Sequence, residues 1–317
     1  MKMFVSIRPQ ITRLQITKLQ NSMNGVIVID KPFGLTSHDV VNRVRRILGQ
    51  RSVGHLGTLD PAATGVLPIV AGNLTRLAQF YVHSEKIYEG VIRFGFATDT
   101  YDADGEPTTP RQDMVMDCDE VRALAAQFQG KIEQMPPPFS AKKIAGVPAY
   151  KLARKKQEVA LKPVQVEIRE FEILNVTADQ AAFRARVASG TYIRSIAHEM
   201  GQKLGCGAHL ASLRRTAAAE FTIEDAHSLP ALEQATQQGI AESLFIHPRK
   251  LVPQLPCVTA TEETAALIRS GRAVNLPEMS RAPQVKVFYG QRDLIAIATR
   301  VAGTLFHPGI VFPSSAA

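Results

Sequence analysis

Residues 54–70, with the sequence GHLGTLDPAATGVLPIV, join a turn-rich stretch to a long apolar run. The stretch contains a single acidic residue, Asp60. Because Pro61 restricts the residue before it, we expect Asp60 to be extended, and the apolar run to anchor the turn in the core. The turn-forming residues around it are Gly54, Gly57, Pro61 and Gly65. Asp60 is therefore either an ordinary turn residue or a functional carboxylate held beside the core.

The charge balance of the chain favours a polyanionic partner. The 317 residues carry a net charge of +8 at pH 7, and the basic residues are spread through the chain. Nucleic acid is such a partner, although a basic enzyme of another kind has the same balance. With 45% hydrophobic residues, the chain is long enough for one large domain and a smaller one.

Neither a metal site nor a disulfide framework is indicated. The three cysteines are far apart, and the sequence has no CxxC, HxxxH or HExxH pattern. We therefore expect no metal and a cytoplasmic location. No apolar stretch approaches the ~20 residues that span a membrane, so we expect no membrane partner. Residues 1–23 are expected to be a flexible extension or a misassigned start, because MNGVIVIDKP reads as the natural beginning of the fold.

Hydrophobic periodicity predicts a mixed α+β domain followed by a small β-rich one. Residues 25–32 read as a buried strand, and TSHDVVNRVRRILG reads as a helix that Thr36 caps and Gly49 ends. A proline-rich connector near residue 250 indicates a boundary. Three short strand patterns follow it, as in a small barrel.

Residues 131–169 differ in composition from the rest of the chain. They contain nine Lys or Arg against three Glu, together with several prolines and the aromatic residues Phe139 and Tyr150. Such a segment is either a solvated surface insertion or one that grips RNA phosphates while its rings stack on bases. Composition alone favours neither interpretation.

Arg194 is placed unusually for a cation. It follows the start of a predicted helix, where the helix dipole disfavours positive charge, and it adjoins the apolar stripe of that helix. Either its side chain extends to solvent or a carboxylate partner holds it. Asp60 is a candidate partner, but the sequence alone does not pair the two.

Five segments carry a resemblance to a known family. They are GVIVIDKPFGLTSHDVV, VGHLGTLDPAATGVLPI, KIYEGVIRFGFATDTYDADG, SGTYIRSIAHEMG and HLASLRRT, in this order. Together they resemble the bacterial TruB-type tRNA pseudouridine synthases, from about residue 24 to residue 225. Five motifs in one order are far more specific than a lone GTLDP.

The resemblance implies an α+β pseudouridine-synthase fold, with a mixed, largely antiparallel central sheet, flanking helices and a small C-terminal PUA-like β-barrel. It implies a catalytic domain at residues 24–248 and an RNA-binding domain at 249–317. It also implies isomerisation of uridine 55 in the T-loop of tRNA to pseudouridine. That reaction needs no cofactor, because the redox state is unchanged and nothing leaves. The implied partner is the T-arm of tRNA, and we expect a monomer without a protein partner.

The family's site residues match positions of this chain. Asp60 matches the catalytic aspartate, Tyr88 the aromatic that stacks on the uracil, and Arg194 the arginine paired with the aspartate. His55 matches the residue that braces the space left by the flipped base. Leu213 is expected to line the uracil pocket, and Lys31 to support its floor.

The basic stretch 131–169 aligns with the family's insertion that closes over the T-loop, which favours RNA contact. The expected backbone contacts are Lys142, Lys143, Lys151 and Arg154. Two alternatives remain beside the synthase: an RNA-binding or RNA-folding protein without essential catalysis, and an N-glycosylase that releases a base. A pure binder needs no placed carboxylate, and a glycosylase yields free uracil.

Overall fold

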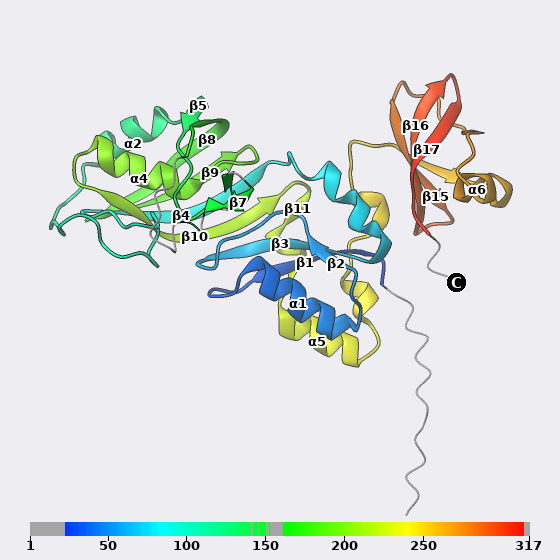
Figure 1. Cartoon of the computed structure of the whole chain (residues 1–317), viewed down its shortest axis with the longest axis horizontal. Helices are drawn as coiled ribbons and strands as arrows, with labels where there is room; N and C mark the ends of the chain where they lie inside the picture. Colours follow the sequence, from blue (N-terminus) through cyan, green and yellow to red (C-terminus); the bar gives the residue numbers. More distant parts are fainter. Residues whose placement is uncertain (1–22, 141, 145, 150–151, 153–160, 314–317) are drawn as a thin grey trace, which may run out of the picture.

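The computed structural model describes residues 23–140, 142–144, 146–149, 152 and 161–313 (Figure 1). These residues form a large mixed sheet with helices packed on it and a smaller second sheet beside it. The expected α+β class is therefore confirmed. None of the helices in these ranges is long and apolar enough to cross a membrane.

A ten-stranded sheet forms the larger part, in the order β12-β1-β3-β10-β4-β9-β8-β5, with β2 paired to β3 and β11 paired to β10. Neighbouring strands are antiparallel except for two parallel pairs, β3 with β10 and β1 with β12. The strands are β1 (Gly25–Lys31), β2 (Val53–His55), β3 (Ala63–Ala71), β4 (Lys86–Phe94), β5 (Gly130–Gln134), β8 (Val164–Thr177), β9 (Gln180–Val187), β10 (Ala208–Ala218), β11 (Phe221–Thr222) and β12 (Ala226–His227).

Four helices share one hydrophobic core with this sheet. Thr36 caps the first of them through a reciprocal pair of hydrogen bonds with Asp39, and Gly49 ends it with a φ of 64°, as expected from the sequence. Strand β1 is buried on both faces, because Ile27 joins the core beneath the helices and Val28 joins a second core. The helices are α1 (Ser37–Leu48), α2 (Cys118–Ala126), α4 (Ile193–Lys203) and α5 (Leu229–Gln237). Short 3₁₀ helices lie at η1 (Gly72–Phe80), η2 (Ile223–Asp225), η3 (Ala241–Leu244) and η4 (Pro248–Lys250).

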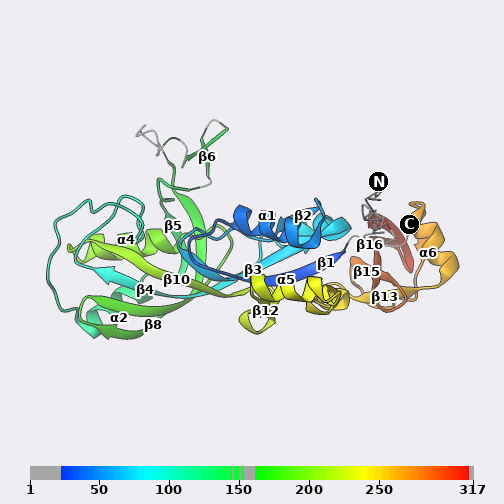
Figure 2. The same ribbon diagram turned by 90° about the horizontal axis from the view of Figure 1, so that it is seen from below.

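The second sheet has five strands in the order β13-β15-β16-β17-β14, and helix α6 (Glu262–Arg269) packs on it around a core of its own. In Figure 2 it lies at the opposite end of the molecule from α2. A partly buried polar cluster ties the large sheet to the segment that leads into the second one: Glu220 accepts hydrogen bonds from the Tyr81 hydroxyl (2.6 Å) and the Val252 N–H (2.9 Å). The domain limits at 248 and 249 stay predictions. The strands are β13 (Cys257–Ala260), β14 (Val274–Asn275), β15 (Gln284–Tyr289), β16 (Asp293–Ala302) and β17 (Leu305–Val311).

Strand β10 lies between β3 and β4 and joins the two halves of the large sheet. At Gly65 the backbones of β3 and β10 approach so closely that a Cβ would collide with the carbonyl oxygen of Arg215, and its φ of 99° also favours glycine. A separate two-stranded pair, β6 (Lys143–Ile144) with β7 (Val147–Pro148), belongs to the basic segment. Figure 2 shows β6 standing out from the sheet.

Candidate active site

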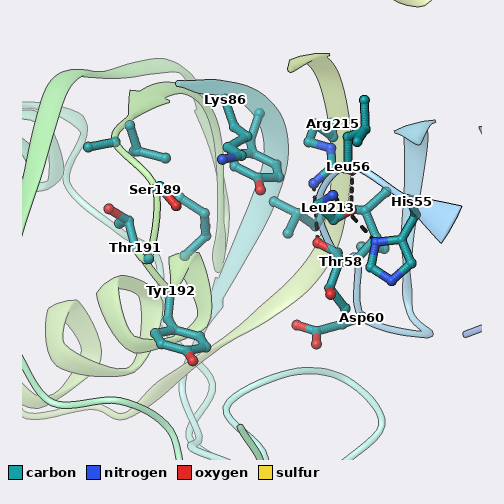
Figure 3. A pocket seen from close by; sticks show the side chains of 18 of the residues that line it. His55, Leu56, Thr58, Asp60, Lys86, Ser189, Thr191, Tyr192, Leu213 and Arg215 are labelled. Carbon is teal, nitrogen blue, oxygen red and sulfur yellow. Dashed lines mark hydrogen bonds between the residues drawn. The ribbon is translucent and has the colours of Figure 1, made fainter. Parts of the chain in front are cut away.

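A cavity of about 460 Å³ lies where the loop after β2 meets β4, β10 and the start of α4. Figure 3 shows Asp60 near His55, at the end of β2, and the loop residue Thr58, and facing a second wall that contains Thr191 and Tyr192. Strands β4 and β10 line the cavity with Tyr88, Leu213 and Arg215, and the Lys86 side chain also reaches it. Its size is in the range of small-molecule sites.

The backbone before Asp60 is held by a single buried hydroxyl. Ser37, the first residue of α1, is only 2% exposed. Its Oγ donates to the Leu59 carbonyl oxygen (3.0 Å) and accepts the Leu59 N–H (2.8 Å). The N-terminus of α1 therefore fixes the residue that directly precedes Asp60.

Arg215 holds the earlier part of the same loop. It is 1% exposed, and its guanidinium donates to the carbonyl oxygens of Val66 (2.7 Å), Gly57 (3.0 Å) and Thr58 (3.2 Å). A buried cation costs free energy unless it is well paired, and here three backbone acceptors pair it. The loop therefore lies against β10.

Lys31 supports the loop on its far side. Its side chain is fully buried, and its Nζ donates to the carbonyl oxygens of Pro32 (2.9 Å) and Pro61 (3.1 Å). Burial lowers the pKa of Lys31 to about 8, although the nearby Asp60 carboxylate opposes this shift. Lys31 thus contacts the loop directly after Asp60, and its role in supporting the floor of the pocket stays a prediction.

Arg194 lies between two carboxylates. Its Nε is 3.0 Å from Asp60 Oδ2, and its Nη1 is 3.3 Å from Asp102 Oδ2. Its side chain is only 6% exposed and also donates to the carbonyl oxygens of Thr100 (3.0 Å) and Phe139 (3.1 Å). These contacts explain a cation in the first turn of α4, since two carboxylates face its charge and both of its Nη atoms donate to carbonyl oxygens.

The groups around Asp60 shift its pKa in opposite directions. The surrounding protein partly desolvates the carboxyl, which raises the pKa of Asp60. Arg194 and Lys31 lower this pKa, Asp102 raises it further, and the net direction is upward. The side chain itself is 43% exposed and lines the cavity, so a bound molecule reaches it. Arg194 therefore limits a pKa rise that burial would otherwise make larger.

The remaining predicted residues fall into two groups. His55, Tyr88 and Leu213 line the cavity with Asp60. Burial lowers the pKa of His55, which favours the neutral imidazole. Of the expected RNA-backbone contacts, Lys142 is exposed and Lys143 belongs to β6, whereas Lys151 and Arg154 lie outside the described residues.

Several residues of the site were not singled out from the sequence. They are Ser37, Lys86, Asp102, Tyr192 and Arg215. All five belong to the motifs quoted above, so the motifs contained them. Only the three-dimensional contacts show which motif residues face the cavity and which hold the loop. Among the described residues, no cluster of His, Cys, Asp or Glu has the arrangement of a metal site.

Comparisons with known proteins identify the family of this chain. Residues 45–193 match the model of the TruB family pseudouridylate synthase N-terminal domain. Residues 194–253 match the tRNA pseudouridylate synthase B C-terminal domain. The tRNA pseudouridine synthase B of Solibacter usitatus is 47% identical over 91% of this chain and its own whole length. That of Bacillus cereus (strain ATCC 10987) is 39% identical over 92% of this chain and 96% of its own.

Solved structures give the same fold. A Cbf5-Nop10-Gar1 complex contains a chain with a TM-score of 0.66 and 26% identity, covering 92% of this chain and 85% of that chain. A chain of an H/ACA RNP bound to a substrate RNA containing 2′-deoxyuridine has a TM-score of 0.67 and 24% identity, over 92% of this chain and 86% of that chain. With both family models matched in sequence order and relatives aligned over nearly their whole length, the chain belongs to the TruB family of pseudouridylate synthases.

Proposed function

We propose that this protein isomerises uridine 55 in the T-loop of tRNA to pseudouridine and that Asp60 is its catalytic residue. The observation that carries the proposal is the Asp60–Arg194 ion pair of 3.0 Å at the wall of the cavity. It places an oriented carboxylate where a nucleotide can enter. An RNA-binding protein without catalysis has no need of such a group.

The reaction rearranges bonds within one nucleotide. The bond between uracil N1 and the sugar C1′ breaks, the uracil turns, and a bond forms between its C5 and C1′. The C5 proton leaves, and N1 gains a proton. The Asp60 carboxylate acts either as a nucleophile, at C1′ or at uracil C6, or as the group that promotes elimination or stabilises a cationic sugar. All of these roles need the ionised form.

Tyr88 and Leu213 are placed to hold the base. Tyr88 lies opposite Arg215 in the β4–β10 pairing, and Leu213 lies two residues before Arg215 on β10. Both side chains line the cavity with Asp60. An aromatic ring and an aliphatic side chain there offer a uracil a stacking surface and an apolar wall. The Tyr88 hydroxyl is the group available to take part in removing the C5 proton.

A uridine inside a folded RNA loop has to leave its stack before it reaches Asp60. His55 is the last residue of β2, directly before the loop that carries Asp60, and it lines the cavity. It is placed to occupy the space that the flipped base vacates. The neutral imidazole that burial favours suits this role, because it inserts among bases without burying a charge.

The parts around the site supply the RNA contacts. The basic segment at 131–169 is proposed to grip phosphates, with Lys142, Lys143, Lys151 and Arg154 as its contacts. Residues 249–317 are proposed to be a PUA-like RNA-binding domain after a catalytic domain at 24–248. The isomerisation consumes no cofactor. We propose that the protein acts as a monomer in the cytoplasm, where its tRNA substrate is.

The test is a pseudouridine map of an unmodified tRNA transcript after incubation with the purified protein, without added metal or cofactor. Pseudouridine at position 55 with the wild type, and none with Asp60→Ala, supports the proposal. Asp60→Ala is expected to keep its affinity for tRNA.

Other results would support a different function or a different catalytic group. A folded, tRNA-binding wild type without product favours the binding protein. Stoichiometric release of uracil favours the N-glycosylase. Product from the Asp60→Ala variant means that another group is catalytic.

A further inference from the structure

Residues 134–140, which we name the strap, run from the end of β5 past the N-terminus of α4. Three sets of hydrogen bonds join the strap to residues 192–195. The Gln134 Nε2 donates to the Tyr192 carbonyl oxygen (3.0 Å), and the Gln134 Oε1 accepts the Tyr192 N–H (2.8 Å). The Ser195 hydroxyl donates to the Met135 carbonyl oxygen (2.7 Å). Arg194 Nη2 donates to the Phe139 carbonyl oxygen (3.1 Å).

The composition of the strap explains why it depends on these ties. Its residues 136–138 are three consecutive prolines, which have no N–H group and a fixed φ. The strap therefore offers carbonyl acceptors but few donors. Gln134 is completely buried, so its amide has to be satisfied within the protein, and the Tyr192 backbone satisfies both of its ends.

The position of the Tyr192 backbone determines the position of Arg194. Tyr192 is the N-cap residue of α4, and its side chain makes no capping hydrogen bond. The Gln134 amide fixes the peptide groups of Tyr192 instead. Arg194 follows two residues later and carries the guanidinium that lies 3.0 Å from Asp60. A shift of Tyr192 therefore moves the charge that orients the carboxylate.

We propose that Gln134 is a positioning residue for the isomerisation: by clamping the backbone of Tyr192, it aligns Arg194 with Asp60. This inference rests on the proposed function. Gln134 does not line the described cavity, so it acts through Arg194 and not on the substrate. A displacement of about 1 Å in a catalytic constellation costs roughly 100-fold in rate. Loss of the clamp is therefore expected to lower kcat and to leave KM unchanged.

The same geometry predicts a change in pH dependence. The charged and titratable groups facing Asp60 are Arg194 from α4, Asp102 from the loop after β4, Lys31 from β1 and Tyr192 at the start of α4. If Arg194 is misaligned, it lowers the pKa of Asp60 less, so desolvation and the Asp102 charge raise this pKa further. The acid limb of kcat then moves to higher pH, which loss of stability alone does not cause.

The chain contains a matched control. Gln50 clamps the backbone of Met23 in the same way, with its Oε1 accepting the Met23 N–H (2.8 Å) and its Nε2 donating to the Met23 carbonyl oxygen (3.0 Å). Gln50 follows α1 and lies outside the cavity lining. Gln50→Leu therefore removes the same pair of amide–backbone hydrogen bonds, together with a longer one from Nε2 to the Ser52 carbonyl oxygen (3.4 Å), from a half-buried place away from Arg194.

The experiment compares kcat, KM and the kcat–pH profile of the wild type, Gln134→Leu and Gln50→Leu on a tRNA transcript. The expected result for Gln134→Leu is a 10- to 100-fold lower kcat, an unchanged KM and an acid limb at higher pH. Gln50→Leu is expected to keep all three values. Equal effects of the two variants, or a loss confined to KM, would overturn the proposal.

A second variant covers the case in which Gln134→Leu does not fold. Ser195→Ala removes the neighbouring tie to Met135, and alanine is favourable in a helix. It is expected to lower kcat less, with the acid limb displaced in the same direction. An unchanged kcat and an unchanged pH profile in folded Ser195→Ala would then contradict the proposal that the contacts of the strap align Arg194 with Asp60.

The wild type separates this inference from the proposed function. If the wild type forms no pseudouridine, the proposed function fails, and the clamp is tested by an NMR titration of the Asp60 carboxyl. A higher Asp60 pKa in Gln134→Leu or Ser195→Ala than in the wild type supports the clamp. The same pKa in all three proteins refutes it.

Discussion

The hydroxyl of Ser37 forms a reciprocal pair of hydrogen bonds with the backbone of Leu59, donating to its carbonyl oxygen (3.0 Å) and accepting its N–H (2.8 Å). One small side chain at the start of α1 therefore fixes both peptide groups of the residue before Asp60. The loop that carries Asp60 is thus attached to a helix that contributes no group to the cavity lining.

Ser37→Ala is expected to loosen this loop. The variant leaves a buried donor and a buried acceptor without a partner, which lowers the free energy of unfolding by about 1–3 kcal/mol. Because Asp60 loses its fixed position, kcat is expected to fall roughly tenfold or more. Chemical denaturation and single-turnover kinetics measure the two effects. The control is Ser52→Ala, whose hydroxyl donates to the Gly72 carbonyl oxygen (3.0 Å) away from the cavity. Equal kcat in both variants contradicts the role of Ser37.

Two adjacent arginines are expected to differ strongly in their effect on stability. Arg215→Met removes three hydrogen bonds to backbone carbonyls inside the protein, which costs roughly 3 kcal/mol or more. Arg214 pairs with Asp30 at 2.8 Å, but its side chain is 41% exposed. Arg214→Met is therefore expected to cost less than about 1 kcal/mol. Urea unfolding of both variants tests this difference, and similar costs would refute it.

The raised pKa of Asp60 predicts the acid limb of the activity. In the proposed mechanism the ionised carboxylate is the active form, so the rate is expected to fall as the pH drops through the folded-state pKa of Asp60, which lies above the ordinary value of 3.8. Asp102→Asn removes a negative charge that raises this pKa, so the limb is expected to move to lower pH. Measurement of kcat against pH, with circular dichroism to confirm folding at each pH, tests both statements. A wild-type limb at or below 3.8 contradicts them.

Affinity for tRNA is expected to fall steeply with salt. Lysine and arginine contacts with phosphates release counterions, so the logarithm of the affinity decreases linearly with the logarithm of salt concentration. Filter binding between about 50 and 200 mM salt gives the slope. Lys142→Ala is expected to reduce this slope by about one. The control is Arg122→Ala, an exposed cation on α2 outside the basic segment. A flat response of the wild type would exclude an electrostatic grip.

Much of the fold was accessible from the sequence because its local signals agree with its packing. The helix after Thr36 carries a capping box, an apolar face and a terminal glycine, and all three are present in the structure. Asp60 was recognisable as the single acidic residue in a turn-rich and apolar stretch, and Arg194 as a cation near a helix N-terminus, where the helix dipole disfavours positive charge. The α+β class followed from these patterns and from the family resemblance.

The contacts between residues far apart in the sequence could not be predicted from it. Nothing local distinguishes Arg215 from Arg214, because burial depends on which face of β10 meets the loop. The same holds for Asp102, which meets Arg194 only when the loop after β4 folds over α4. Gln134 reads as an ordinary polar residue at the end of a strand, and its partner is Tyr192, 58 positions later in the chain.

The central place of β10 has a consequence for the order in which the protein becomes active during synthesis. Asp60 belongs to the half of the sheet that contains β1 and β3, whereas Tyr88 lies on β4 in the other half. These halves pair only through β10, residues Ala208–Ala218. A nascent chain that has not yet released this strand from the ribosome holds the carboxylate and the aromatic ring on two unconnected sheets. We therefore expect the proposed site to be completed only after residues 208–218 have left the ribosome.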